Sequence, residues 1–366
     1  MMTPRRFAFL ALAGVAVIAL ALRVSSLRHL ERTVDAGQQV LPSLAGALNT
    51  VTEVRLIKGD GTRTSLKKSA DDWLVSERGF PADSSQVRKL LIDLSSLQVV
   101  EQKTREPANY AQIGVEDVNS PKAGGTLIEI VMPAKTLRLV VGKQSGTKSS
   151  FVRIAGEPQS LLVTPQVTAD ADPRRWLDRD VLDLSQSRVK EVAIAPHGSP
   201  AYVVTRPSAQ QGDFSVPNLP KGRELVSVSA ANPQAGALTA LQLDDVRRSG
   251  ATPADADHAK FTTFDGLTLE VSGHKDGDRR LISLAAQSAA KDSAAEAQRL
   301  TARFGGWDIE IPSYKYDALF KPLEELLKKP PEPPKKAGKG ATASKAKAAA
   351  QGPQMSPAAG APPTSK

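Results

Sequence analysis

The sequence contains no cysteine, few histidines and few aromatic residues. Of its 366 residues, four are histidines, and aromatic residues make up 4%. Without cysteine, a disulfide scaffold, thiol catalysis and cysteine-bound zinc are excluded. The histidines are scattered along the chain: His29, His197, His258 and His274. A chain without cysteine fits either a reducing cytosol or a bacterial envelope protein that lacks disulfides.

Net positive charge is confined to the two ends of the chain. The formal net charge is +9, of which residues 1–30 contribute +4 and residues 330–366 contribute +5. Residues 31–329 therefore carry no net charge. A nucleic-acid-binding domain is expected to carry its positive charge on a folded face. The distribution argues against a nucleic-acid partner.

A phosphate-binding loop is missing as well. The nearest approach is the glycine- and lysine-rich stretch at residues 142–149. A Walker loop needs Gly, Lys and Ser or Thr in direct succession, and it leads from a strand into a helix. Here a strand-like stretch, Phe151-Val152-Arg153-Ile154, follows instead. We therefore predict a hairpin turn at residues 142–149.

One long apolar run is present, at residues 7–22 behind Arg5-Arg6. Its sixteen uncharged residues fall short of the roughly 20 of a typical spanning helix, but arginines at both ends can extend it to the headgroups. We expect an uncleaved transmembrane anchor at residues 7–22, with residues 1–6 in the cytoplasm and the body outside it. The alternative is a cleaved signal peptide, since Ala19-Leu20-Ala21 has the small-x-small form of a cleavage site.

Residues 23–48 are expected to form a juxtamembrane helix or linker. Apolar residues continue beyond the anchor at spacings compatible with a helix: Leu27, Leu30, Val34 and Leu41.

The first folded module is expected at residues 49–186. Residues 51–56 alternate between two faces, as in a half-buried strand, and Asp60-Gly61 supplies a turn to a return strand. Another strand begins at Trp73, and Pro81 is expected to block further strand pairing. Asp83 is a good helix N-cap, and an apolar stripe follows it: Val87, Leu90, Leu91, Leu94 and Leu97. A helix packed on an antiparallel sheet is the simplest arrangement.

A second module at residues 187–329 is expected to repeat the first. Residues 189–194 resemble residues 51–56 at an offset of 138, and Phe214 answers Trp73 at 141. The offset grows to 147 where residues 309–312 answer residues 162–165. A slowly growing offset is typical of a duplication with small loop insertions. The predicted fold class is therefore α+β: two duplicated modules of small antiparallel sheets with packed helices, after an N-terminal transmembrane helix.

The second module differs from the first around residues 293–306. There, Ser293 and Glu296 predict a capping box, and Gly305-Gly306 ends a helix where the first module has a strand.

Two acidic clusters are the candidates for chemistry. Asp178, Asp180 and Asp183 do not match the spacing of a calcium loop, and we expect them at a solvated helix end after Asp172 and Pro173. The stretch Asp255-Ala256-Asp257-His258 is the nearest approach to a metal or acid–base cluster, but it lies in an expected connector without a second cluster to complete a coordination shell. We therefore predict no catalytic, cofactor-binding or metal-binding residue, and no cofactor.

Residues 330–366 are expected to be a disordered tail. Proline, alanine, lysine and glycine dominate this segment, so it has too little apolar surface to offset the entropy of ordering. Its positive charge allows weak contact with anionic polymers or lipid.

Several motifs together resemble a known family. They are Leu41-Pro42-Ser43-Leu44, Trp73, Pro81-Ala82-Asp83, Tyr110, Ile113-Gly114-Val115, Val141-Gly142-Lys143, Phe151-Val152-Arg153 and Arg174-Arg175-Trp176-Leu177. Over roughly residues 41–184 the chain resembles the mostly membrane-anchored bacterial proteins of the domain of unknown function 4340. Family members commonly have a tyrosine directly before the glycine that Tyr110 here precedes by four. The motifs are structural, so the resemblance implies a fold and an address but no catalytic residue.

Two classes of function remain open. The resemblance implies a single-pass protein of the bacterial inner membrane with its body in the periplasm, acting as an accessory component beside ABC-type transport or gliding-motility proteins. Inner-membrane lipid around residues 7–22 and a protein of an envelope complex would then be its partners. The alternative is an envelope hydrolase that uses carboxylates such as Asp178, Asp180, Asp255 or Asp257. A weaker alternative is a module in which the tail binds cell-wall polymer or anionic lipid.

Overall fold

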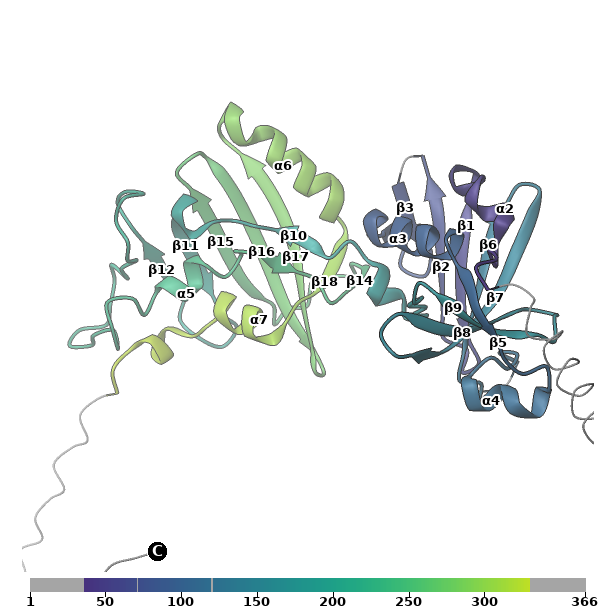
Figure 1. Ribbon diagram of the computed structural model, residues 1–366. Helices are drawn as coiled ribbons and strands as arrows, with labels where there is room; N and C mark the ends of the chain where they lie inside the picture. Colours follow the sequence, from purple (N-terminus) through teal and green to yellow (C-terminus); the bar gives the residue numbers. More distant parts are fainter. Residues whose placement is uncertain (1–35, 71, 120, 330–366) are drawn as a thin grey trace, which may run out of the picture. The chain divides into compact units, whose positions relative to one another are not determined.

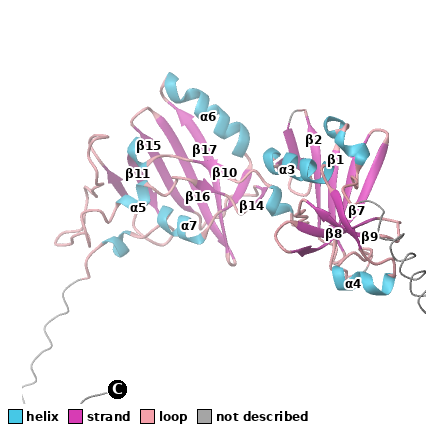
Figure 2. Cartoon of the chain, in the orientation of Figure 1, coloured by secondary structure: helices cyan, strands magenta, loops and turns pink. Residues whose placement is uncertain are grey.

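The computed structural model describes residues 36–70, 72–119 and 121–329, which form antiparallel sheets with packed helices (Figures 1 and 2). The predicted α+β class with antiparallel sheets is confirmed. The two main sheets have nine and seven strands and are thus larger than the small sheets predicted. A two-stranded ribbon of β10 (Asp180–Leu182) and β13 (Leu241–Gln242) completes the strand structure of the described residues.

The first sheet has the strand order β4-β3-β2-β1-β6-β7-β8-β9-β5. Its strands are β1 (Glu53–Lys58), β2 (Arg63–Ser69), β3 (Asp72–Val75), β4 (Phe80–Pro81), β5 (Gln98–Gln102), β6 (Thr126–Met132), β7 (Lys135–Ser145), β8 (Ser149–Ile154) and β9 (Ser160–Thr164). The predicted hairpin at residues 142–149 is confirmed, because β7 turns directly into β8 and the two strands pair.

Helix α3 (Ser84–Ser95) packs against the inner face of this sheet, the face that carries fully buried side chains such as Val54 and Leu56. The helix begins where predicted, because the Asp83 carboxylate accepts hydrogen bonds from two backbone N–H groups of the first turn. Its predicted apolar stripe is buried, and Leu94 is fully buried. The prediction that Pro81 blocks strand pairing is wrong: Pro81 lies in β4 and pairs with Leu74 of β3. This pairing is tolerated because β4 is an edge strand, where a missing N–H breaks no central ladder.

The outer face of the first sheet is covered by the connection between β5 and β6. This connection contains the short helices η2 (Pro107–Asn109) and α4 (Tyr110–Ile113), and Gly114 ends α4 in the left-handed conformation with φ 71°. Tyr110 and Val115 pack there on Leu127 of β6 and Val140 of β7, as a second, smaller hydrophobic cluster. We call residues 105–118 the cover segment.

The second sheet has the strand order β12-β11-β15-β16-β17-β18-β14. Its strands are β11 (Val189–Ala195), β12 (Tyr202–Thr205), β14 (Asp245–Arg248), β15 (Asp257–Thr263), β16 (Leu267–Asp276), β17 (Arg279–Ser288) and β18 (Trp307–Glu310). Its helices are α5 (Asn232–Ala235), α6 (Lys291–Phe304), α7 (Ser313–Leu319) and η5 (Leu323–Leu326). Long α6 lies along β17 (Figure 1), and α7 closes on the same inner face, because a Cβ at Gly273 would meet Tyr316 and Phe320.

Helix α6 corrects the predicted capping box. The helix begins at Lys291 with Ala290 as its N-cap, so Ser293 lies inside the helix. The Ser293 hydroxyl donates instead to the Asp265 carbonyl oxygen at 2.9 Å, and Glu296 pairs with Arg188 at 2.8 Å. The predicted end is correct, since Gly305 follows the last helical residue.

The two sheets share one order of pairing. The order β2-β1-β6-β7-β8-β9-β5 in the first sheet matches the order β12-β11-β15-β16-β17-β18-β14 in the second, element by element along the chain. In each sheet, a segment that precedes the first strand of the sheet in the chain also forms a hydrogen bond at or next to an edge strand, which is β5 in the first sheet and β14 in the second. Gly37 donates to the carbonyl oxygen of Val99 in β5 at 2.8 Å, and Leu243, just before β14, donates to Arg179 at 2.9 Å.

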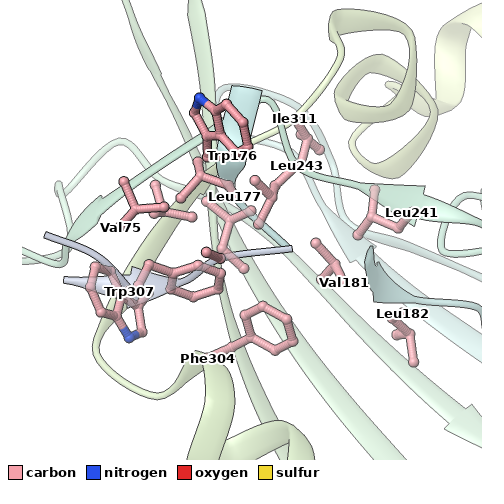
Figure 3. Packing of buried hydrophobic residues seen from close by; sticks show 14 of the residues in the cluster. Val75, Trp176, Leu177, Val181, Leu182, Leu241, Leu243, Phe304, Trp307 and Ile311 are labelled. Carbon is pink, nitrogen blue, oxygen red and sulfur yellow. The ribbon is translucent and has the colours of Figure 1, made fainter. Parts of the chain in front are cut away.

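One hydrophobic cluster contains side chains from both sheets. The ring of Phe80 in β4 lies 6.1 Å from that of Phe304 in α6 and 5.1 Å from that of Trp307 in β18. Figure 3 shows Trp307 and Phe304 together with Val75 and Leu177 in this cluster. A bidentate ion pair between Arg78 and Asp245, with its shorter contact at 2.6 Å, adds to these contacts.

The predicted anchor at residues 7–22 and the predicted tail at residues 330–366 lie outside the described residues, as does most of the juxtamembrane segment. Of residues 23–48, the described part contains the paired segment at 37–40 and the short helix α2 (Pro42–Ala45). Among the described residues, no helix has the length and apolarity needed to cross a bilayer.

Candidate functional site

A hollow lies on the outer face of the second sheet, opposite α6 and α7. Its volume is about 430 Å³, and it crosses strands β12, β11, β15 and β16. Its lining residues are mostly apolar: Ala193, Ile194, Ala195, Ala201, Tyr202, Val203, Val216, Pro217, Asn218, His258, Ala259, Lys260, Glu270, Val271 and Ser272. A volume of this size with an apolar floor and a few polar groups is typical of a binding site.

Strand register explains why this part of the sheet is hollow. Residues directly opposite one another on neighbouring strands share a face of the sheet. One outer row therefore runs from Ala195 through His258 to Ser272, which are paired in register. The neighbouring row runs in the same way from Ala193 to Lys260 and Glu270. Since β11 contributes only alanine to both rows, the floor is low there.

Four polar side chains of the hollow lie on β15 and β16. His258 Nδ1 is 3.1 Å from the Ser272 hydroxyl oxygen. Lys260 Nζ forms an ion pair with Glu270 at 3.1 Å, and both side chains are about half exposed, at 55% and 51%. Such an exposed pair adds little to stability, so these groups remain available to an incoming molecule.

The same place on the first sheet is filled by the chain itself. There the corresponding row is Ile57, Leu127 and Val140, again paired in register. The cover segment packs on this row through Tyr110 and Val115. The second sheet has no equivalent segment among the described residues, because only residues 249–256 connect β14 to β15, whereas residues 103–125 connect β5 to β6.

The predicted Asp255–His258 cluster is divided by the sheet. Asp257 and His258 are successive residues of β15, and successive side chains point to opposite faces. Asp257 accepts hydrogen bonds from the Tyr316 hydroxyl at 2.6 Å and from the His197 backbone N–H at 2.7 Å. Burial, and then this hydrogen bond, raise the pKa of Tyr316 well above its ordinary value. Asp255 is exposed before the strand. The expected connector thus begins a strand at Asp257, and no acid–base pair forms.

The other predicted carboxylates hold the chain that links the sheets. They lie in and beside β10, not at a solvated helix end as predicted, because the turn η3 (Pro173–Trp176) ends before them. Their partners are Arg303 for Asp178 at 2.7 Å, the Gln242 amide for Asp180 at 3.0 Å and the Ala240 N–H for Asp183 at 2.8 Å. A hollow of about 510 Å³ does contain Asp180 and Asp183, but each carboxylate already accepts a hydrogen bond there.

Sequence reasoning missed the alanine floor of the outer hollow. The one available signal was the alternation of Ala193 and Ala195 with buried Val192 and Ile194, which marks a strand with only small residues on one face. The arrangement favours non-covalent binding through apolar contact and hydrogen bonds.

Comparison with known proteins identifies a family. The model of the family "Domain of unknown function (DUF4340)" matches residues 73–263. This range begins in β3, after the motif at residues 41–44, and extends through β15 of the second sheet. No curated protein and no solved structure matches the chain.

Proposed function

The chain belongs to the family Domain of unknown function (DUF4340), and from that premise we propose that it is a non-catalytic interaction protein of the bacterial envelope. In this proposal residues 7–22 anchor it in the inner membrane, and the two sheets lie in the periplasm.

The observation that carries the interaction role is the uncovered hollow of about 430 Å³ on the second sheet. In the first sheet, the corresponding outer row is covered by the chain's own Tyr110 and Val115. In the second sheet His258, Lys260 and Glu270 on that face are exposed. A face that the fold covers in one half and leaves bare in the other supports binding of another molecule.

The membrane address rests on the apolar run at residues 7–22 and the flanking Arg5-Arg6. Mass spectrometry of the mature N-terminus, after isolation from membranes, tests it. The expected result is an intact N-terminus on a protein that resists extraction from membranes with alkaline carbonate. A new N-terminus directly after Ala21 would contradict the anchor, since it would leave a secreted soluble protein.

The kind of complex is proposed by analogy with the family: an ABC-type transport or gliding-motility-like assembly. Purification of the tagged full chain from detergent-solubilised membranes, with quantitative mass spectrometry, tests this role. A membrane protein of such an assembly should be enriched in stoichiometric amount. Purification of the chain alone, under mild detergent and after in-cell cross-linking, would contradict an accessory role.

We also propose that the modules at residues 49–186 and 187–329 arose by duplication. The shared strand order supports this, and so does one detail of hydrogen bonding. In the first module, Asp83 N donates to Trp176 O at 2.8 Å and Asp178 N donates to Pro81 O at 3.0 Å. In the second, Val226 N donates to Leu326 O at 2.9 Å and Lys328 N to Glu224 O at 2.8 Å. In each module the pair joins the segment before a helix, α3 or α5, to the short helix η3 or η5 near the end of the module.

A further inference from the structure

We infer that the outer hollow of the second sheet binds a tight turn of a partner protein that presents an aliphatic side chain. The inference rests on the proposed function and gives the binding mode and the chemistry of the partner. It concerns the row Ala195–His258–Ser272 and its rim at Pro217 and Asn218.

The first sheet shows what kind of group covers this face of the fold. Its cover segment is a helical turn that ends at Gly114 in the left-handed conformation. Ile113 and Val115, on either side of that glycine, belong to the cluster that packs on Leu127 and Val140. A tight turn brings two aliphatic side chains to one spot while its own backbone groups stay paired, as in the 3.1 Å bond from Val115 N to Tyr110 O.

The floor of the second sheet differs in size and polarity at each matched position. Ala195 stands where the first sheet has Ile57, His258 where it has Leu127, and Ser272 where it has Val140. An alanine in place of the isoleucine leaves space above β11 for an apolar group. The histidine and serine add hydrogen-bonding groups beside that space.

The rim favours a polypeptide as the occupant. The segment after the bridge between Thr205 and Ser215 continues beside β12, so Pro217 and Asn218 form one wall of the hollow. The amide of Asn218 has both a donor and an acceptor for a peptide backbone, and within the described residues it has no partner. Lys260 and Glu270, in the neighbouring row of the floor, offer one charge of each sign. Such a wall matches the alternating donors and acceptors of a turn.

The experiment uses the tagged full chain in its native membranes and compares three proteins: wild type, Ala195→Leu and Gln287→Leu. Ala195→Leu fills the hollow. Gln287→Leu adds an exposed leucine to the outer face of β17, beyond the lining of the hollow. Ala193→Leu serves as a second filling variant, in case Ala195→Leu folds poorly. The protein that is enriched with wild type is quantified with each variant.

We expect at least a tenfold loss of the partner with the filling variants and no loss with Gln287→Leu. Equal recovery with all variants would overturn the inference and leave the proposed function standing. The absence of any enriched partner with wild type would instead remove the proposed function, and the inference with it.

A photo-cross-linking residue at Pro217 identifies the occupant directly. The expected product joins this position to a turn of the enriched partner that contains Ile, Leu or Val. A product joined to a second copy of this chain, to its own residues 330–366 or to lipid would overturn the inference, as would a partner segment without an aliphatic residue.

Discussion

At the scale of single residues, two buried arginines show how this protein uses charge inside its fold. Arg153 and Arg206 are each 3% exposed, and each guanidinium stacks on an aromatic ring at 4.8 Å, of Tyr110 and Phe214 respectively. Arg206 donates to several backbone carbonyl oxygens, including that of Val189 at 3.0 Å, and burial lowers its pKa. These guanidinium groups close loops and therefore serve the fold.

Replacing Arg153 with alanine should lower the free energy of unfolding by about 3 kcal/mol, because buried carbonyl oxygens would lose their donor. The Arg153 guanidinium donates to Val115 O at 2.8 Å and to Glu157 O at 3.1 Å. Arg138→Ala is the control, since this arginine is 54% exposed in its pair with Glu129 and should contribute about 1 kcal/mol or less. Urea unfolding measures both. Equal losses would mean that Arg153 does not hold the cover segment.

Tyr316 predicts a specific dependence on alkaline pH. Burial and the hydrogen bond to Asp257 raise its pKa above 10.0. The folded protein therefore keeps a proton that the unfolded chain releases above about pH 10. The stabilisation is complete below that pH and is lost as pH rises towards the folded pKa.

In urea unfolding from about pH 8 to about pH 11, Tyr316→Phe should show a shallower alkaline loss of stability than wild type. Tyr314→Phe, at a side chain that is 67% exposed, should keep the slope of wild type. An unchanged slope in Tyr316→Phe would show that other groups cause the alkaline loss.

At the scale of elements, glycines decide how closely the cover segment approaches the first sheet. A Cβ on Gly125 would lie 2.2 Å from the Gly114 carbonyl oxygen, and one on Gly142 would lie 2.3 Å from that of Ile113. Both contacts are with backbone atoms, which cannot rotate away. These glycines belong to the close packing of the segment rather than to a binding loop.

Gly125→Ala should cost about 2 kcal/mol or more, because the backbone of the cover segment would have to move away. The neighbouring Gly124→Ala is the control, since its Cβ would lie no nearer than 3.7 Å to any atom. Thermal unfolding compares the two. A similar small effect from both would show that the segment has room to shift.

Helix α3 should depend on one of its faces alone. Leu90→Ala should destabilise the protein by roughly 2–5 kcal/mol, as for a buried leucine, because Leu90 is only 4% exposed. Ile92 of the same helix is 55% exposed, so Ile92→Ala should change the free energy of unfolding by about 0.5 kcal/mol or less. Denaturant titration measures the free energy of unfolding of both variants. Equal effects would show that the buried face of α3 is assigned wrongly.

At the scale of the whole molecule, the two sheets are distinct in hydrogen bonding but share apolar contacts. Each sheet has its own ladder, whereas the Phe80 ring contacts Phe304 and Trp307. Each half can therefore fold independently only if the apolar side chains on the inner face of its own sheet form a stable core without those of the other sheet.

A fragment of residues 36–186 should unfold cooperatively, with a lower midpoint than the full chain because Phe80 loses its ring contacts. A fragment of residues 49–186 should be less stable still, since Val99 of β5 and Leu97 just before it lose the bonds from Gly37 and Val40. Urea unfolding followed by circular dichroism measures all three. A fragment without a cooperative transition would show that both halves need one common core.

The sequence by itself determined what depends on near neighbours in the chain. Asp83 and the leucines after it specify α3, because capping and helical spacing act within a few residues. Alternation specified β1 in the same way, and the resemblance of residues 189–194 to residues 51–56 predicted β11.

Only the tertiary structure decided which side chains meet across strands. Pairing of β11, β15 and β16 brings residues about 60 to 80 positions apart into one row, and no local pattern sets that register. The fold also places Asp257 and His258 on opposite faces of β15, and it places Ser293 inside α6. The hollow depends on a missing cover as much as on its own alanines, and a missing cover is visible only when both faces of both sheets are compared.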